Sequence, residues 1–464
     1  MLSIPLPIIT AAPVWQDEEA RLDWFGSDIP DWHQFAVDER SFLLVADQSQ
    51  IFEIDGAEFS RHISRLDPET PPAHVLAEFG IPPTHAVDDT PLEAPPLRAL
   101  SLAVAQKCNL GCTYCYAQEG DFGGQAKAMS LDVALAAVER LFEDCAPHDR
   151  VNLSFLGGEP LLGREVLRAA TQRAAQLGRE RAVRVGFSIT TNGTLLTPED
   201  GDFFEQYGFA VTISIDGVGE THDRQRSFKS GRGSYEHILA RLQPLLGRQR
   251  QMHVSARVTV TPRNLELPQT LDTLVGLGFH AVGFSPMLAS PTGRDAMDRD
   301  SLSVMLGQMI ECGRAFERRV IAGERYPFSN MGAAMQALHR GTHRPYPCGA
   351  GAGYLGVSAD GDLFACHRFV NDDTAAFGDL THGIDRARQA AWLRDRHVHR
   401  QTPCRGCWAR YLCGGGCHHE VLRRGRPACD YIRGWLDYCL QAYMRLVESR
   451  ADYFMSELPT EAAL

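Results

Sequence analysis

Short β-like and helix-like segments alternate between residue 98 and about residue 286, and this alternation limits the folds open to the chain. The β-like runs are LRALSLAVA, VNLSFLG, AVRVGFSIT, FAVTISIDG, HVSARVTVT and HAVGFSP, with helix-like runs such as LDVALAAVERLF between them. Strands joined by helical crossovers form a parallel sheet covered by helices. The pattern therefore predicts an α/β fold with a partial (β/α)6, TIM-like barrel, whose chemistry gathers at the C-terminal ends of the strands.

Three cysteines follow the first predicted strand in the sequence KCNLGCTYCY, as Cys108, Cys112 and Cys115. Three thiolates at this spacing can wrap one face of a 4Fe–4S cubane and leave one iron open. An open iron can be chelated by the amino and carboxylate groups of S-adenosylmethionine (SAM). A structural zinc site is the alternative, but such sites normally close with four ligands.

The spacing of these cysteines, with Tyr114 before the last one, resembles the signature of the radical SAM superfamily. Other segments match the superfamily's SAM-contacting pattern in order: LGGEP after the second strand, TTNG after the third, SIDG after the fourth, and then His222, Asp223 and Arg226. The resemblance implies that SAM-contacting residues are Tyr114, Gly157, Gly158, Glu159, Asn192, Ser214 and Arg226. In that reading backbone carbonyls of LGGEP accept from the methionyl ammonium, and Arg226 offers a bidentate fork to the carboxylate.

Eight further cysteines crowd between residues 348 and 439, enough to ligate two four-coordinate clusters or two zinc sites. Their order resembles the SPASM domain, the auxiliary-cluster extension of radical SAM enzymes that modify peptides. The resemblance implies two auxiliary 4Fe–4S clusters. It assigns Cys404, Cys407, Cys413 and Cys429 to an outer cluster, and Cys348, Cys366, Cys417 and Cys439 to an inner one. The reverse assignment of Cys429 and Cys439 stays open, and one of them can be free.

The pattern predicts three regions. Residues 1–97 hold a small α+β unit at about 33–90, with two short strands and two helices, and a proline-rich linker at 88–97. Residues 98–320 form the barrel, and residues 321–464 form the auxiliary-cluster region with a C-terminal helix. The small unit resembles the winged-helix-like peptide-recognition modules that precede many SPASM enzymes, which implies that a peptide adds a strand to its sheet edge. A structural cap on the barrel is the alternative.

The family that the chain resembles most is that of the maturation proteins of quinohemoprotein amine dehydrogenase, on RYLCGGGCHHEV (410–421) and CDYIRGWLDYC (429–439). This resemblance implies thioether bonds between Cys sulfur and Asp or Glu carbon in the small subunit of that enzyme. It also implies a peptide substrate and an electron donor such as flavodoxin or ferredoxin.

Two other functions stay open. Sulfatase-type maturases, which oxidise Cys or Ser to formylglycine, resemble the chain at CGAG (348–351). They place an Asp base where this chain has His367, and a histidine there is a candidate catalytic base. A non-catalytic iron–sulfur protein that transfers electrons or senses redox state is the alternative from another class.

The bulk composition narrows the partners and the compartment. A formal net charge of -12 provides no surplus of Lys and Arg for nucleic acid. The chain has no basic residue before Arg21 and no uninterrupted apolar run of about 18 residues. We expect a cytoplasmic protein that binds neither nucleic acid nor membrane. Cys145 and Cys312 stand alone in helix-like runs, which predicts buried, inert thiols.

Overall fold

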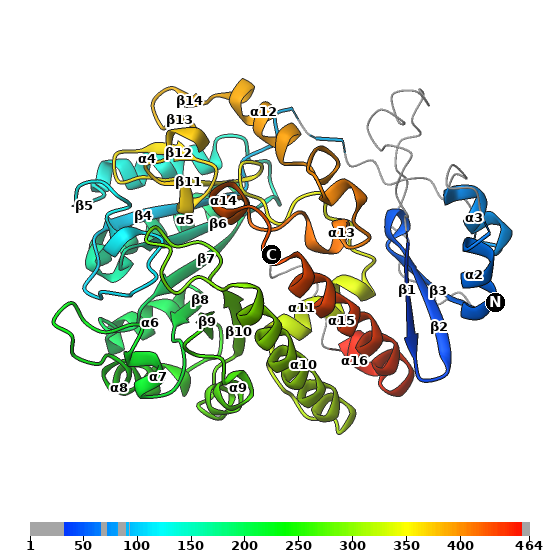
Figure 1. Ribbon diagram of the computed structural model, residues 1–464. Helices are drawn as coiled ribbons and strands as arrows, with labels where there is room; N and C mark the ends of the chain where they lie inside the picture. Colours follow the sequence, from blue (N-terminus) through cyan, green and yellow to red (C-terminus); the bar gives the residue numbers. More distant parts are fainter. Residues whose placement is uncertain (1–31, 66–71, 82–89, 92, 457–464) are drawn as a thin grey trace.

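Six parallel strands form the centre of the computed structural model, which describes residues 32–65, 72–81, 90–91 and 93–456. Their order in the sheet is β10, β9, β8, β7, β6, β4 (Figure 1). Barrel strands that follow one another along the chain therefore lie side by side in the sheet. They are β4 (Ala99–Gln106), β6 (Arg150–Gly157), β7 (Arg184–Thr191), β8 (Ala210–Ser214), β9 (His253–Val260) and β10 (Ala281–Pro286). The predicted partial barrel of six β/α units is confirmed.

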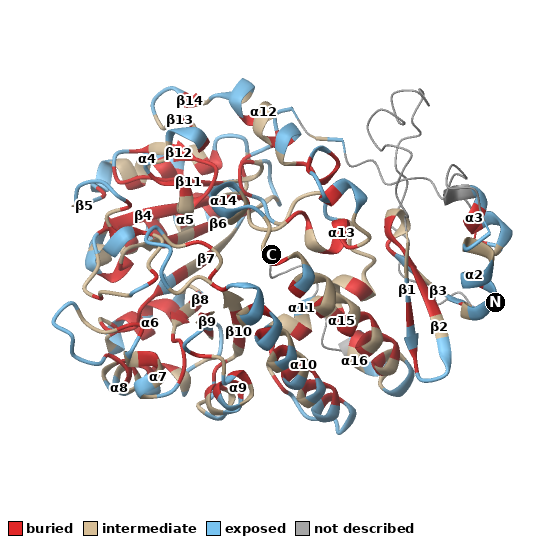
Figure 2. Ribbon diagram, viewed as in Figure 1, coloured by how far each residue is buried: buried red, intermediate tan, exposed pale blue. Residues whose placement is uncertain are grey.

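Helices cover the outer face of the barrel, and local sequence signals set where they begin. Ser130 caps α4 by accepting from Val133 N, and Thr197 and Asp200 form a capping box on α6. The helices are α4 (Leu131–Phe142), α5 (Arg164–Arg181), α6 (Pro198–Gln206), α7 (Glu220–Asp223), α8 (Tyr235–Leu246), α9 (Leu267–Gly276), α10 (Arg299–Ile321) and α11 (Ser329–His339). Leu153 and Phe155 on β6 are fully buried. Figure 2 shows buried residues in red along the barrel strands.

The C-terminal region extends the barrel sheet. Strand β11 (Tyr354–Val357) pairs in parallel with β4, and β12 (Asp362–Phe364), β13 (Ala376–Asp379) and β14 (Gly383–Ile384) follow antiparallel; a short β5 (Lys127–Ala128) also pairs with β4. The helices of this region are α12 (Arg386–Arg396), α13 (Arg410–Cys413), α14 (His418–Arg424), α15 (Cys429–Ser449) and α16 (Ala451–Ser456). The barrel and the cysteine-rich region therefore share one hydrogen-bonded sheet.

The N-terminal unit is a separate three-stranded antiparallel sheet, β1 (Trp32–Val37), β2 (Arg40–Val45) and β3 (Gln50–Ile54), followed by α2 (Gly56–Ile63) and α3 (Pro72–Glu78). The two expected helices are present, but the first expected strand is a hairpin that turns at Asp38, which has a positive φ of 53°. The unit packs on α15, where His33 Nε2 lies 2.7 Å from Asp437 Oδ1 (Figure 1). Its role in peptide recognition stays a prediction.

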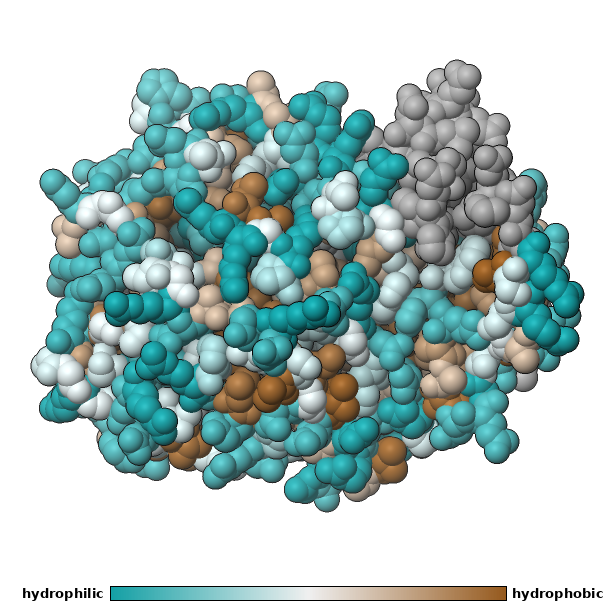
Figure 3. Space-filling view, viewed as in Figure 1, coloured by the Kyte–Doolittle hydropathy of each residue, from teal (hydrophilic) through white to brown (hydrophobic). Residues whose placement is uncertain are grey.

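On the face shown in Figure 3, apolar side chains form small, separate areas among hydrophilic ones. No helix among the described residues is long and apolar enough to span a membrane. Residues 1–31 and residues 88, 89 and 92 of the expected linker lie outside the described residues, and the expected domain boundaries stay predictions.

Candidate functional site

The three cysteines of the loop after β4 lie together. Cys108, Cys112 and Cys115 are half-buried. Burial is the main cause that raises the pKa of the Cys112 thiol to about 12; the cation of Arg226 opposes it, and the sulfurs of Cys115 and Cys108 add to it. The charges of the three sulfurs therefore act on one another, so the three side chains lie close together. Iron would displace these protons on binding.

Backbone hydrogen bonds fix this loop on the segment after α7. Gly111 N donates to Ser227 O at 3.0 Å, and Thr113 N donates to Gln225 O at 3.1 Å. The cysteine loop and the residues around Arg226 are therefore held as one layer above the barrel.

The LGGEP turn after β6 supports the loop from the other side. Gly158 N donates to Ala105 O at 2.8 Å, and Glu159 N donates to Lys107 O at 2.9 Å. A Cβ on Gly158 would lie 2.2 Å from Lys107 O, and Gly157 has a φ of +145°. Only glycine fits at this close approach of two backbones.

The Glu159 side chain is fully buried and binds protein groups. Its carboxylate accepts from Leu161 N at 3.0 Å, Thr191 Oγ1 at 2.7 Å and Asn192 N at 2.7 Å. Burial raises the pKa of Glu159, and the hydrogen bonds from Asn192, Thr191 and Leu161 oppose that rise. The carboxylate joins the ends of β6 and β7. Because the carboxylate is engaged by protein groups, the SAM contact expected at Glu159 can come only from its backbone carbonyl.

Asn192 touches the cysteine loop directly. Its Nδ2 donates to Asn109 Oδ1 at 2.9 Å and lies 3.7 Å from Cys108 Sγ, while its Oδ1 accepts from Thr194 N. The side chain of Asn192 therefore helps to orient Cys108. Ser214 ends β8 half-buried, and its hydroxyl has no hydrogen-bond partner among the described residues, so it stays available to a ligand.

Tyr114, Asp216 and Arg226 form a buried polar network beneath the loop. Arg226 Nη1 donates to Tyr114 OH at 2.6 Å and lies 3.6 Å from Asp216 Oδ2, and the Tyr114 hydroxyl donates to the same carboxylate. Arg226 Nε is buried with no partner among the described residues. One nitrogen of the Arg226 guanidinium, Nη1, is thus bound by protein groups. The unpartnered Nε fits an anionic group of a bound cofactor.

His222 and Asp223 have structural positions. His222 is fully buried; its Nδ1 accepts from Asp216 N at 3.1 Å, and its Nε2 lies 3.0 Å from Ser234 Oγ. Burial lowers the pKa of His222 to about 3, so the ring is neutral. Asp223 Oδ1 accepts from Ser234 N and Tyr235 N and so begins α8. Neither side chain points to a ligand site.

Four cysteines gather in the outer set. Burial raises the pKa of Cys404 to about 11; Arg426 opposes the rise, and the sulfurs of Cys413, Cys429 and Cys407 add to it. A cavity of about 280 Å³ is bordered by all four cysteines. This grouping matches the set that the resemblance implies for the outer cluster.

Three cysteines gather in the inner set. Burial raises the pKa of Cys366 to about 12, and the sulfurs of Cys417 and Cys348 add to this. The expected fourth member, Cys439, is not brought to them. It is fully buried within α15, where burial raises its pKa and Glu317 is the charged group that acts on it. Its assignment to the inner cluster has no support from this placement.

The two isolated cysteines differ in burial. Cys312 is fully buried on α10, as expected, whereas Cys145 is only half-buried and lies just beyond α4. No three or more His, Cys, Asp or Glu side chains of the described residues are close enough to share one metal ion. A cubane does not require such a group, because it binds each thiolate to a different iron.

His367 lies between the two cysteine regions. Its ring centroid is 6.0 Å from that of Tyr116, and its Nδ1 is 2.7 Å from the hydroxyl of Tyr354, which in turn is 2.8 Å from Ser101 Oγ. Burial lowers the pKa of His367 to about 3, and the nearby guanidinium of Arg368 acts in the same direction. His367 is therefore neutral and held by a chain of hydroxyl groups.

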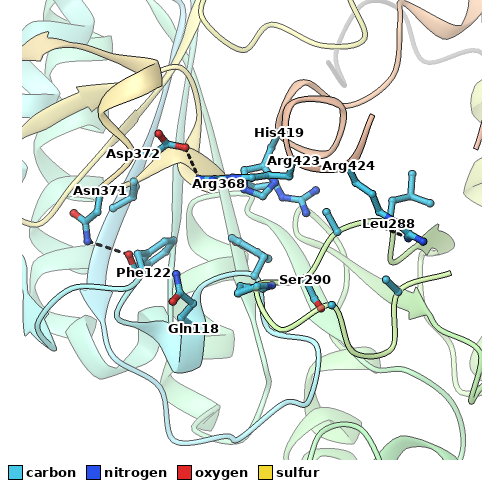
Figure 4. A pocket seen from close by; sticks show the side chains of 16 residues that line it. Gln118, Phe122, Leu288, Ser290, Arg368, Asn371, Asp372, His419, Arg423 and Arg424 are labelled. Carbon is cyan, nitrogen blue, oxygen red and sulfur yellow. Dashed lines mark hydrogen bonds and ion pairs between the residues drawn. The ribbon is translucent and has the colours of Figure 1, made fainter. Parts of the chain in front are cut away.

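A cavity of about 590 Å³ joins these regions. In Figure 4, Arg368, His419 and Arg423 from the auxiliary region face Phe122 and Gln118 of the segment after the cysteine loop. The wall continues with residues after β10 (288–291, 293 and 296). Sequence reasoning missed the arginines of this wall, because they form no spaced motif and meet the barrel only in the fold.

Comparisons with known proteins give the similarities of the chain as a whole. Residues 102–274 match the radical SAM superfamily. The chain is 25% identical over 357 residues to a serine-type anaerobic sulfatase-maturating enzyme of Klebsiella aerogenes, covering 74% of this chain and 85% of that protein. It is 30% identical over 156 residues to a cysteine-type anaerobic sulfatase-maturating enzyme of Clostridium novyi, covering 32% and 41%. An uncharacterized protein of Archaeoglobus fulgidus is 26% identical over 361 residues, covering 73% and 79%.

The solved structure of native anSMEcpe with bound AdoMet and the Kp18Cys peptide has the same fold, with a TM-score of 0.62 at 18% identity, and covers 77% of this chain and 100% of that one. The barrel therefore has the radical SAM fold, and the chain is similar in sequence to anaerobic sulfatase-maturating enzymes. These findings do not support the narrower resemblance to the maturation proteins of quinohemoprotein amine dehydrogenase. The sulfatase-type alternative fits them better.

Proposed function

We propose that this chain is a radical SAM enzyme that oxidises a Cys or Ser side chain of a peptide or protein substrate to formylglycine. One observation carries the proposal. The 590 Å³ cavity is bordered by Tyr116, next to Cys115, and by Arg368 and His419, next to the inner cysteines. A substrate side chain in this cavity lies between the radical source and an electron acceptor. The sequence relatives named as sulfatase-maturating enzymes support the same reaction class.

The cysteine sets of the chain would hold the cofactors. Cys108, Cys112 and Cys115 would bind the SAM-cleaving cluster, and SAM bound there would supply the 5′-deoxyadenosyl radical that removes a hydrogen atom from substrate carbon. Arg226 Nε and the Ser214 hydroxyl are the groups left for SAM. The two C-terminal sets would hold auxiliary clusters that take the second electron.

Around the substrate, this chain's own residues orient groups and hold protons. Arg368 lies 5.0 Å from the centroid of the Tyr116 ring, and together these side chains narrow the cavity beside Cys115. In the tautomer whose Nδ1 donates to the Tyr354 hydroxyl, the neutral ring of His367 carries a lone pair on Nε2. His367 does not border the cavity and its lowered pKa makes the ring a weak base, so the role of catalytic base stays a proposal for this residue.

Thioether formation between a Cys and an Asp or Glu of the substrate is the second candidate, and the charge of the cavity wall favours it. Arg368, Arg423 and Arg424 face the cavity against the carboxylate of Asp372. Arg423 pairs with Asp372 and Arg368 pairs with Glu420, so the wall keeps one net positive charge, on Arg424, which attracts an acidic side chain. His367, in the position where formylglycine-forming maturases place an Asp, agrees with this candidate too.

Peptide binding and electron delivery complete the proposal. The edge strands β1 and β3 of the N-terminal sheet are where a substrate segment could add a strand. A flavodoxin or ferredoxin would provide the electron that starts each cycle. We place the enzyme in the cytoplasm, where such donors and reduced clusters are maintained.

Anaerobic incubation of the reconstituted enzyme with SAM, reductant and peptide tests the function. One peptide carries the Cys segment of a sulfatase, and the other is the small subunit of quinohemoprotein amine dehydrogenase; each is matched by a version with Cys replaced by Ala. Formylglycine formation from Cys replaces sulfur by oxygen and gives a carbonyl that reacts with hydrazides. A thioether keeps the sulfur, removes two hydrogens and blocks alkylation of the thiol. Intact clusters without any SAM cleavage would refute both reactions.

A further inference from the structure

One arginine on a barrel strand has no bonded partner. Arg257 lies in the middle of β9, where buried residues alternate with residues that face the barrel interior, namely Ser255, Arg257 and Thr259. The Arg257 side chain is exposed there. Its guanidinium makes no hydrogen bond and no ion pair with any residue that the structure describes. It is therefore open to a ligand that enters the barrel.

The charged groups around Arg257 show where its guanidinium lies. Surrounding protein lowers the pKa of Arg257, and the charge of Arg368 acts in the same direction. Glu420, Tyr116 and Cys417 act in the opposite direction. Tyr116 directly follows the first cysteine loop, and the other three groups belong to the auxiliary region. The guanidinium therefore lies where the cysteine loop and the auxiliary region meet.

Arg226 and Arg257 lie on different sides of the site. Burial raises the pKa of Cys112, and Arg226 is the cation that opposes the rise. Burial lowers the pKa of His367, and Arg257 is one of the cations that lower it further. Arg226 is therefore the cation beside the first cysteine loop, where SAM would bind, and Arg257 is a cation beside the auxiliary region.

The carboxylate that acts on Arg257 is already engaged. Glu420 Oε1 accepts from Arg368 Nη1 at 2.9 Å. Two guanidiniums therefore share one carboxylate, which leaves one positive charge without a counter-ion among these three side chains. A charge that is largely surrounded by protein needs a partner of opposite sign. A carboxylate fits a guanidinium best, because it can accept two parallel hydrogen bonds.

We propose that Arg257 binds a carboxylate of the substrate, the side chain of an Asp or Glu. Arg257 does not border the 590 Å³ cavity, but Tyr116 and Arg368 do, and both act on its charge. An acidic side chain that reaches from the cavity past these two residues meets the guanidinium. The inference rests on the proposed peptide-modifying function and favours its thioether form, because formylglycine formation needs no carboxylate on the substrate.

Peptide binding to the SAM-loaded holoenzyme tests this role without turnover, because SAM is not cleaved when reductant is left out. One labelled probe is the Cys-containing segment of the small subunit of quinohemoprotein amine dehydrogenase, and the other is the same segment with Asn and Gln in place of Asp and Glu. We expect Arg257→Gln to bind the acidic probe about 10- to 150-fold more weakly than the wild type does, as for loss of a charge-assisted hydrogen bond. Its affinity for the amide probe should equal that of the wild type.

Two further variants complete the comparison. Arg257→Lys keeps the charge and loses the planar fork, so its affinity for the acidic probe should lie between those of Arg257→Gln and the wild type. Arg248→Gln, at a half-exposed arginine that pairs with Asp202 beyond α8, is the matched control and should bind both probes as the wild type does. Equal affinity of the wild type for the two probes would overturn the inference, whether or not the variants fold.

Two other roles of Arg257 give different results. A cation that only balances the charge of the inner cluster would, on replacement by Gln, change the iron content or the electron paramagnetic resonance signal and weaken both probes equally. A cation that holds SAM would lower SAM affinity in equilibrium dialysis and leave the preference for the acidic probe unchanged. Either result would overturn the inference.

The inference and the proposed function fail separately. A preference for the acidic probe that is lost in Arg257→Gln, together with no product from any peptide once reductant is added, would keep the carboxylate site and reject the reaction. Product formation by an enzyme that binds both probes equally would keep the function and reject the site.

Discussion

Replacing Tyr114 by Phe tests the polar network beneath the cysteine loop. The change removes one hydroxyl and keeps the ring, which is only 5% exposed. That hydroxyl accepts from Arg226 and donates to Asp216. A hydrogen bond to a charged group contributes about 1.5–3 kcal/mol. The phenol makes two, but Arg226 and Asp216, already 3.6 Å apart, can close on each other and recover part of the loss.

We therefore expect a net loss of about 1.5–3 kcal/mol in the organisation of Arg226, which is about a 10- to 150-fold weaker SAM affinity. Anaerobic equilibrium dialysis of SAM against the reconstituted variant measures it. Tyr116→Phe is the matched control, because the Tyr116 hydroxyl has no hydrogen-bond partner among the described residues. Equal SAM affinity of both variants and the wild type, at full iron content, would refute the role given to the network.

Two further predictions concern buried titratable groups. Glu159→Gln should lower the free energy of unfolding by roughly 2–4 kcal/mol, because an amide NH2 then faces donors that now bind a carboxylate; denaturant unfolding beside the exposed control Glu165→Gln measures it, and equal losses would contradict the reasoning. The lowered pKa of His222, about 3 against an ordinary 6.5, contributes stability that is present above pH 6.5 and is lost as the pH falls toward 3. The loss is up to about 1.4 kcal/mol per pH unit. Melting curves from pH 7.5 to 5.5 should show a shallower decline in His222→Asn, and parallel declines would oppose this assignment.

The barrel could be predicted because each of its elements carries its own signal. The helix expected at LDVALAAVERLF is α4, since Ser130 caps it and its apolar residues recur at helical spacing. The pairing of β11 with β4 had no such signal, because it joins residues about 250 positions apart through backbone hydrogen bonds. The N-terminal hairpin was missed because its turn at Asp38 interrupts a run that otherwise resembles one strand.

The site was predictable where spacing alone fixes a cluster of ligands. The cysteines at 108–115 are close in sequence, so any compact loop brings them together. Cys429 and Cys439 were ambiguous because both lie on one long helix, and only the packing of α15 decides which of them faces the other cysteines. Arg226 was found by its motif, but its engagement with Tyr114 and Asp216 depends on two other strand ends.

The shared sheet has a consequence for electron flow. The strand that leads to the first cysteine loop, β4, is hydrogen-bonded to β11, and β11 to β12, which leads to Cys366. The separation of the first cysteine loop from Cys366, and of the clusters proposed there, is therefore set by a ladder of main-chain bonds and not by a flexible tether. Lengthening the connection between residues 322 and 326 should leave the tunnelling distance between the proposed clusters unchanged, whereas disrupting the β4–β11 ladder should uncouple them even with every thiol in place.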